Sequence, residues 1–328
     1  MPTSGKWYDD LDAVARDAAG ALDRNRRPSL FDRFDWYRLT RTHILPHAKL
    51  AVVSAADAWL FLIEDAPRRA APLGSWYSLR FGPIGDPTLL FRAAATRFDR
   101  IALHSLDDAT MRATKTALRE TGWRPFTTRI STNWTIDLAS QDFATYWAAR
   151  PAQLRNTVTR RSRSHPVDIR IHRAFDAEAW ADYEAIYAAS WKPSEGWLPF
   201  LRALAEQEGA AGTLRLGVAR DPSGRAVAAQ LWLVEGGVAT IHKLAHREDA
   251  KAGSPGSILS HAMFRAAIDE DRVHRIDFGL GDEPYKADWM DAAAPIWRID
   301  AYRPATLRGL IGVAREIASR LARHRPLD

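Results

Sequence analysis

The sequence contains no cysteine. Structural disulfides, zinc–thiolate sites, iron–sulfur clusters and thiol nucleophiles are therefore excluded. No spacing of His, Asp and Glu suggests a metal site, so we expect none. No apolar run reaches the roughly 18 residues that span a bilayer, and the acidic, mixed N-terminus has no apolar core of the signal-peptide type. We therefore expect a cytoplasmic protein, or one attached peripherally to the inner face of the membrane.

A chain of 328 residues with 46% hydrophobic content can bury two moderate cores, and its patterns alternate between strands and helices. We therefore expect an α/β (α+β) fold. The first half predicts strands at 49–53, 59–64, 75–81, 101–104 and 127–138, and a helix at 111–121. The second half predicts a strand at 168–171, helices at 177–191 and 197–207, and strands from Leu214, Ala226 and Val238 joined by the turns DPSG and EGG.

The most informative segment follows the last of these strands. Ser254, Pro255 and Gly256 predict a tight turn, and Ser257 offers a cap to an apolar helix that begins there. Such a helix start can hold phosphate or pyrophosphate. A strand predicted at 273–278 then leads to titratable groups, which are Asp277, Asp282, Glu283, Tyr285 and Lys286. The alternatives are an ordinary connection and a solvated acidic turn paired with Lys286.

These residues resemble the acyltransferase family named for a cellulose-biosynthesis protein, a branch of the GNAT superfamily related to the FemAB peptidyltransferases. The resemblance rests on a short set of matches over residues 149–302: Lys251 with Ser254-Pro255-Gly256, Asp277-Phe278, the run GDEPYK at 281–286, and Trp289. GDEPYK is the specific match. The loop departs from the usual GNAT pyrophosphate motif because only one glycine follows Gly253.

The resemblance implies tandem GNAT-like domains with mixed sheets flanked by helices. Residues 1–139 would form a degenerate copy and residues 140–328 the acyltransferase domain. The donor's pantetheine arm would lie between two splayed strands. Acyl-CoA or acyl carrier protein would serve as co-substrate, with no permanently bound cofactor. The predicted donor-binding residues are Lys251, Ser254, Pro255, Gly256, Ser257 and Lys286.

The implied reaction moves an acyl group to an amine acceptor, an amino-lipid such as a sphingoid base or an amino sugar. Asp282 or Glu283 would act as the base, with His242 as the alternative, and Tyr285 would protonate the leaving thiolate. A satisfied core histidine is an equally good interpretation of His242. An aminoacyl-tRNA-dependent transferase of the FemAB type and a non-catalytic binding scaffold remain open.

Charge is unevenly distributed. Residues 150–173 contain seven arginines against Asp168 alone, and 306–323 predict a helix with one apolar face edged by arginines. These arginines could contact donor phosphates, an anionic membrane or nucleic acid, or they could form a solvated face on a helix docked against the core. Nucleic acid is disfavoured because the tryptophans are scattered through core segments.

Three weaker features complete the sequence analysis. Gln230, in a buried strand, either lines an acceptor pocket or is satisfied by neighbouring backbone. An aromatic loop around 191–200 could close over an apolar chain or pack in the core. Ser190 and Ser194 lack a nucleophile-elbow context, so no Ser–His–Asp relay is expected.

Overall fold

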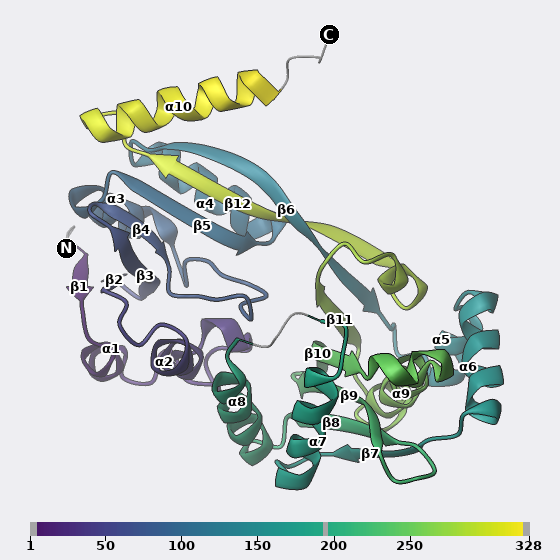
Figure 1. Cartoon of the computed structure of the whole chain (residues 1–328). Coiled ribbons are helices and arrows are strands. Elements are labelled where there is room, and N and C mark those ends of the chain that lie inside the picture. The colour runs from purple at the N-terminus through teal and green to yellow at the C-terminus, as the bar shows by residue number, and fades with distance from the viewer. Residues whose placement is uncertain (1–4, 193–195, 324–328) are drawn as a thin grey trace. The chain divides into compact units, whose positions relative to one another are not determined.

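The computed structural model describes residues 5–192 and 196–323. By its internal contacts the chain divides into two compact units. The first unit comprises the residues up to Ser131 together with those from Ala294 onward, and the second unit comprises Thr132–Ala293. Each unit contains strands of a mixed sheet with helices against them (Figure 1). The expected α/β fold is therefore confirmed.

Both units follow the same order of strand, two helices, three strands, helix and strand. In the first unit these are β1 (Lys6–Tyr8), α1 (Leu11–Ala18), α2 (Phe34–His43), β2 (Leu50–Ala55), β3 (Ala58–Ala66), β4 (Arg69–Pro72), α3 (Pro87–Arg97) and β5 (Arg100–Leu106), with α4 (Asp108–Glu120) after them. In the second unit they are β7 (Asp168–His172), α7 (Ala177–Ala188), α8 (Leu198–Ala210), β8 (Leu214–Arg220), β9 (Ala226–Glu235), β10 (Val238–His246), α9 (Pro255–Arg265) and β11 (Arg275–Leu280), preceded by α5 (Phe143–Ala148) and α6 (Ala152–Ser164).

The strands of each unit are completed by a strand from the other half of the sequence. In the strand order of the sheet, β1-β2-β3-β4-β5 is followed by β12, which spans Ala292–Tyr302 and pairs Ala301 with Ile101 of β5. The order β7-β8-β9-β10-β11 is followed by β6, which spans Arg124–Asp137 and pairs Ile136 with Ile276 of β11. In each of these two series one neighbouring pair is parallel, β4 with β5 and β10 with β11.

This exchange of strands explains how the units differ from the expected division at residue 139. Residues 294–328 group with the first unit, because β12 pairs with β5, and residues 132–139 group with the second, because β6 pairs with β11. The last helix, α10 (Leu307–Arg323), follows β12 and belongs to the first unit. The assignment of functions to the two domains stays a prediction.

The core of the second unit fixes α9 against its sheet. Leu259, Met263 and Phe264 of α9 are buried with Trp232 of β9 and Ile276 of β11. Gly217 of β8 permits this close packing, since a Cβ there would lie 2.5 Å from the sulfur of Met263. Packing of α9 by its apolar face determines where its first turn lies.

Two local predictions were wrong. Residues 75–81 form no strand, because the amide of Ser75 bonds to the Ser78 hydroxyl in a local turn and the strand of this region is β4. Helix α9 begins at Pro255, so Ser257 lies in its first turn rather than capping it. Among the residues that the structure describes, no helix is long and apolar enough to cross a membrane.

The strand exchange predicts the outcome of a truncation. Deleting residues 294–328 removes most of β12 and should expose the unpaired edge of β5, so hydrogen exchange in β4 and β5 should accelerate. The amides of β8, β9 and β10 should keep their protection, because β12 pairs with none of them. Faster exchange confined to β8–β11 would contradict this topology and favour a division at residue 139.

Candidate functional site

The parallel strands β10 and β11 stay together for only three residues. Val238, Ala239 and Thr240 pair with Arg275, Ile276 and Asp277. Beyond Thr240 a bulge at His242 interrupts the register of β10 with β9, and beyond Asp277 the register of β11 with β6 shifts as well. Because the strands are parallel, their carboxyl ends reach the same edge of the sheet, where ligands of α/β proteins commonly bind. The segments that follow the two ends are therefore the candidate site.

The start of α9 follows the end of β10. Ser254 adopts the left-handed conformation, with φ 53°, and its side chain makes no capping hydrogen bond. Gly256 has no such backbone requirement, and a Cβ there would make only an ordinary contact, 3.4 Å from the His246 ring. Pro255 has no N–H, and the N–H groups of Ser257 and Ile258 donate to the Ser254 carbonyl oxygen at 3.1 and 3.2 Å. The Gly256 N–H and the positive end of the helix dipole are therefore what an anion could bind here.

Gln230 holds this first turn on the sheet. Its amide nitrogen donates to the carbonyl oxygen of Gly256 at 3.2 Å and to the hydroxyl of Ser260 at 2.7 Å. Its amide oxygen accepts from the indole of Trp232 at 2.9 Å. These bonds satisfy the buried amide within the protein, so Gln230 positions α9, in agreement with the interpretation that neighbouring groups satisfy it.

The predicted donor-binding residues fall on two different turns. Ser254, Pro255, Gly256 and Ser257 share the turn at α9, and Lys251 precedes it, exposed and 3.0 Å from the Glu248 carboxylate. Lys286 lies instead in the turn after β11. There it is 4% exposed and donates to the Leu280 carbonyl oxygen at 2.6 Å. This buried hydrogen bond stabilises the turn after β11.

The GDEPYK turn is built around this buried lysine. The Glu283 carboxylate lies 3.0 Å from the Lys286 ammonium, and Gly281, with φ 138°, has no room for a Cβ beside these two groups. The indole of Trp134 in β6 donates to the Gly281 carbonyl oxygen at 2.9 Å. Glu283 therefore pairs with Lys286, as one interpretation of the sequence supposed.

Two further carboxylates of this edge are held by β6. The Thr132 hydroxyl donates to the exposed Asp282 carboxylate. Asp277 is 7% exposed and accepts from the amide of Asn133 and, at 2.9 Å, from the backbone N–H of Gly279. Thr132 and Asn133 were not among the site residues predicted from the sequence. The available signal was two adjacent polar residues inside a strand, which need partners when buried.

Tyr285 stands partly exposed at the same turn, with its ring edge-on to Phe278 at 5.8 Å between centroids. Burial, and then the nearby Glu283 carboxylate, raise the pKa of its phenol well above the usual value. Tyr285 therefore keeps its proton throughout the physiological range, and the raised pKa also makes the phenol a weaker acid.

His242 is the inserted residue of the β10 bulge and is buried. Burial, and then the charge of Lys243, lower its pKa to about 3. The imidazole is neutral at physiological pH but is a weak base, so this environment favours the core-histidine interpretation over a catalytic one. His246, beside Gly256, also has a lowered pKa because it is half-buried.

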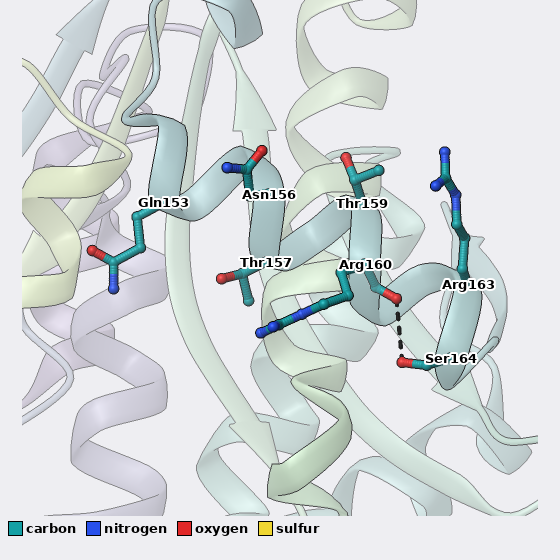
Figure 2. Close-up of a pocket in the computed structure, with 7 residues that line it drawn as sticks. All are labelled: Gln153, Asn156, Thr157, Thr159, Arg160, Arg163 and Ser164. Carbon is teal, nitrogen blue, oxygen red and sulfur yellow. Dashed lines mark hydrogen bonds between the residues drawn. The ribbon is translucent and has the colours of Figure 1, made fainter.

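A polar surface pocket runs along α6, the arginine-rich segment of the sequence. Gln153, Asn156, Thr157, Thr159, Arg160, Arg163 and Ser164 line it (Figure 2). The end of α6 adjoins the turn before α9, since a Cβ at Gly253 would lie 3.2 Å from the His165 side chain. The exposed guanidinium groups of Arg160 and Arg163 therefore lie on an element that adjoins this turn.

The remaining candidates add no chemistry. The Ser190 hydroxyl donates to the Tyr187 carbonyl oxygen at 2.7 Å, which is a local helix-end bond, and Ser194 lies outside the described residues. Of the aromatic loop, Trp191 and Trp197 are exposed and Phe200 is buried. Within 5–192 and 196–323, no group of His, Asp and Glu could hold a metal ion.

Comparison with known proteins agrees with this geometry. Residues 148–287 match the family model described as acetyltransferase (GNAT) domain. Similar solved structures include FemX, with 9% identity, 90% of this chain and 96% of that chain covered, and a TM-score of 0.61. They also include L-PGS from Bacillus licheniformis, with 14% identity, 91% and 98% covered, and a TM-score of 0.53.

A third similar structure, from Agrobacterium fabrum, is the C-terminal domain of a protein described as a lysylphosphatidylglycerol synthetase. It shares 14% identity over 87% of this chain and 91% of that one, with a TM-score of 0.58. At these identities the likeness shows the fold alone. A comparison with curated protein sequences found no match.

The fold and the parted parallel strands are like those of the GNAT-type structures to which the chain is similar. Residues 148–287 match a GNAT acetyltransferase domain, and the protein is an acyltransferase. The resemblance based on GDEPYK and the tandem GNAT-like fold are thereby confirmed, while the roles of the individual site residues stay predictions.

The burial of His242 predicts a pH-dependent stability. The pKa of the imidazole is about 3 in the folded protein and 6.5 when exposed, so between these pH values the unfolded chain binds a proton that the folded protein does not. The free energy of unfolding is therefore highest above pH 6.5 and decreases as pH falls from 6.5 toward 3. The loss is about 1.4 kcal/mol per pH unit. Relative to His242→Gln, the parent should therefore lose about 2 kcal/mol between pH 7 and pH 5 in urea unfolding. His47→Gln, an exposed control, should track the parent. If the free energies of unfolding of the parent and of His242→Gln differed by the same amount at pH 7 and at pH 5, the burial argument would be contradicted.

Proposed function

We propose that the protein is an N-acyltransferase, which moves an acyl group from an acyl thioester, acyl-CoA or acyl carrier protein, to an amine. One observation carries the proposal. β10 and β11 part after three paired residues, and the segment after β10 leads to a helix start whose N–H groups carry no side-chain cap. A pantetheine arm fits between parted strands, and its phosphates fit the start of α9.

In the proposed reaction the amine nitrogen attacks the thioester carbonyl carbon. The carbonyl oxygen takes up negative charge, which a backbone N–H at the β10 bulge would stabilise. Collapse of the tetrahedral intermediate breaks the carbon–sulfur bond and leaves an amide. The proton of the attacking amine goes to a base, and Tyr285 gives its proton to the departing thiolate.

Asp282 is the base that we favour. It is exposed at the edge where the strands part, and the Thr132 hydroxyl orients it. Glu283, the other predicted base, is 3.0 Å from the Lys286 ammonium and is held in that ion pair. Asp277, buried beside Asn133, is suited to orient an incoming ammonium group. Lys251, Ser254, Pro255, Gly256 and Ser257 keep their proposed donor-binding role.

The proposed acceptor is an amino-lipid, such as a sphingoid base, or an amino sugar. The proposal includes a cytoplasmic location, peripheral to the anionic inner face of the membrane. Proteins of similar fold described as L-PGS and lysylphosphatidylglycerol synthetase make a lipid acceptor reasonable, although their identity to this chain is only 14%.

An aminoacyl-tRNA is the second candidate donor. Arg160 and Arg163 favour it, because they are exposed on α6, the helix whose end adjoins the turn before α9, and arginines bind nucleotide phosphates (Figure 2). Calorimetry with acyl-CoA, acyl carrier protein and aminoacyl-tRNA distinguishes the donors, and no binding of any of them would favour the non-catalytic scaffold.

Replacing Gly256 by Glu should abolish binding of acyl-CoA. Like charges 4 Å apart near a protein surface repel by about 4 kcal/mol, so the affinity should fall at least ~100-fold. Gly256→Ala is the matched control, because its Cβ meets only the His246 ring at an ordinary distance. Equal affinities of the Glu variant and the parent, measured by calorimetry, would exclude a donor phosphate at α9.

Asp282→Asn should lower kcat by a factor of about 10² to 10⁴, the usual contribution of a general base, with donor affinity close to normal. Glu283→Gln should instead lower the melting temperature, because it leaves the buried Lys286 ammonium without its carboxylate. Tyr285→Phe should lower kcat less than Asp282→Asn does if departure of the thiolate is not the rate-limiting step. A normal rate per folded molecule in Asp282→Asn would mean that the base lies elsewhere.

A further inference from the structure

The apolar side of α10 faces away from the protein. Its leucine and isoleucine side chains are exposed, namely Leu307 (75%), Leu310 (53%), Ile311 (43%), Ile317 (42%) and Leu321 (67%). Ala314 and Ala318, on the same side of the helix, are exposed as well. An amphipathic helix of a globular domain usually buries this stripe. The sequence was also compatible with a helix docked on the core. The helix α10 is docked, but by the side opposite its apolar stripe.

Small and paired polar residues make the inner side of α10. Gly309 and Gly312 lie against the Arg303 backbone and the Tyr302 ring, with no room for a Cβ at either position. Arg320 donates to the Thr127 carbonyl oxygen of β6 at 3.2 Å and pairs with Glu316 at 2.8 Å. In Figure 1 the helix, drawn in yellow, runs along β12 and along the part of β6 that belongs to the first unit. These contacts determine which side of α10 is outward.

The outward side has a rim of positive charge. Arg308 and Arg315 are exposed beside the apolar stripe. The acidic residue of α10, Glu316, is turned toward the protein and paired with Arg320. An apolar stripe with cations at its edge matches a membrane surface that carries anionic lipid, since the side chains enter the acyl boundary while arginines reach the phosphates.

We propose that α10 lies in the headgroup region of an anionic membrane, with Leu310, Ile311 and Ile317 inserted. This inference supplies the surface for the peripheral location included in the proposed function. A second copy of the chain fits less well. A helix of 17 residues is about 25 Å long and 10–12 Å wide, roughly 300 Å² in projection, against about 800 Å² per partner in a stable dimer. Self-association would also bring like-charged rims together.

The test is binding of the full chain to vesicles of phosphatidylcholine with and without 30% phosphatidylglycerol, by co-sedimentation. The parent should bind the anionic vesicles, more weakly as salt rises. Arg308→Gln with Arg315→Gln should weaken binding about 25-fold, at about fivefold per arginine. Arg26→Gln with Arg119→Gln, exposed arginines of the same unit, gives the same change of net charge and should have little effect.

Leu310→Asn with Ile317→Asn should weaken vesicle binding at least ~10-fold. Both side chains are exposed, so the melting temperature should stay within a few degrees of the parent. Equal binding of this variant and the parent, or no preference of the parent for anionic vesicles, would overturn the proposal. So would a dimer in light scattering that the variant converts to a monomer. The assay contains no donor or acceptor, so its result is independent of whether acyl transfer is observed.

Discussion

The short parallel pairing of β10 with β11 is the constraint on which the candidate site depends. Parallel neighbours need a crossover, here the turn and helix α9, so the end of β10 leads directly to a helix start. The bulge at His242 and the register shift after Asp277 end the pairing early. Gln230 then ties the first turn of α9 to the sheet. The end of the strand pairing and the helix start that we propose as the donor-phosphate site therefore arise from the same connection.

The first unit repeats this connection without repeating its chemistry. β4 and β5 are parallel over two residues, and α3 forms the crossover between them. At the start of α3, however, the Asp86 carboxylate accepts from the Thr88 amide, and this hydrogen bond lowers the Asp86 pKa. A fixed negative charge thus occupies the position that a donor phosphate would need. This difference gives a physical basis for treating the first half as a degenerate copy.

Local patterns sufficed to predict most strands and helices of the second unit and the connection at Gly256, because side-chain periodicity and turn residues act over a few positions. The exchange of β6 and β12 could not be predicted, since register between distant strands depends on the whole core. For the same reason the bond between Thr132 and Asp282, 150 residues apart, was missed. Residues 75–81 misled the analysis because alternating aromatic and polar residues can also pack in a turn.

The acidic residues of the GDEPYK turn differ in what holds them, and this difference separates architecture from chemistry. The Lys286 ammonium, buried and bonded to the Leu280 carbonyl oxygen, compensates the charge of Glu283 and stiffens the turn. Removing either partner would leave an uncompensated group, so this pair is suited to a structural role. The Thr132 hydroxyl, in contrast, orients the Asp282 carboxylate. A general base must be held in place and still accept a proton. The ion pair thus provides a rigid edge beside the carboxylate that we propose as the base.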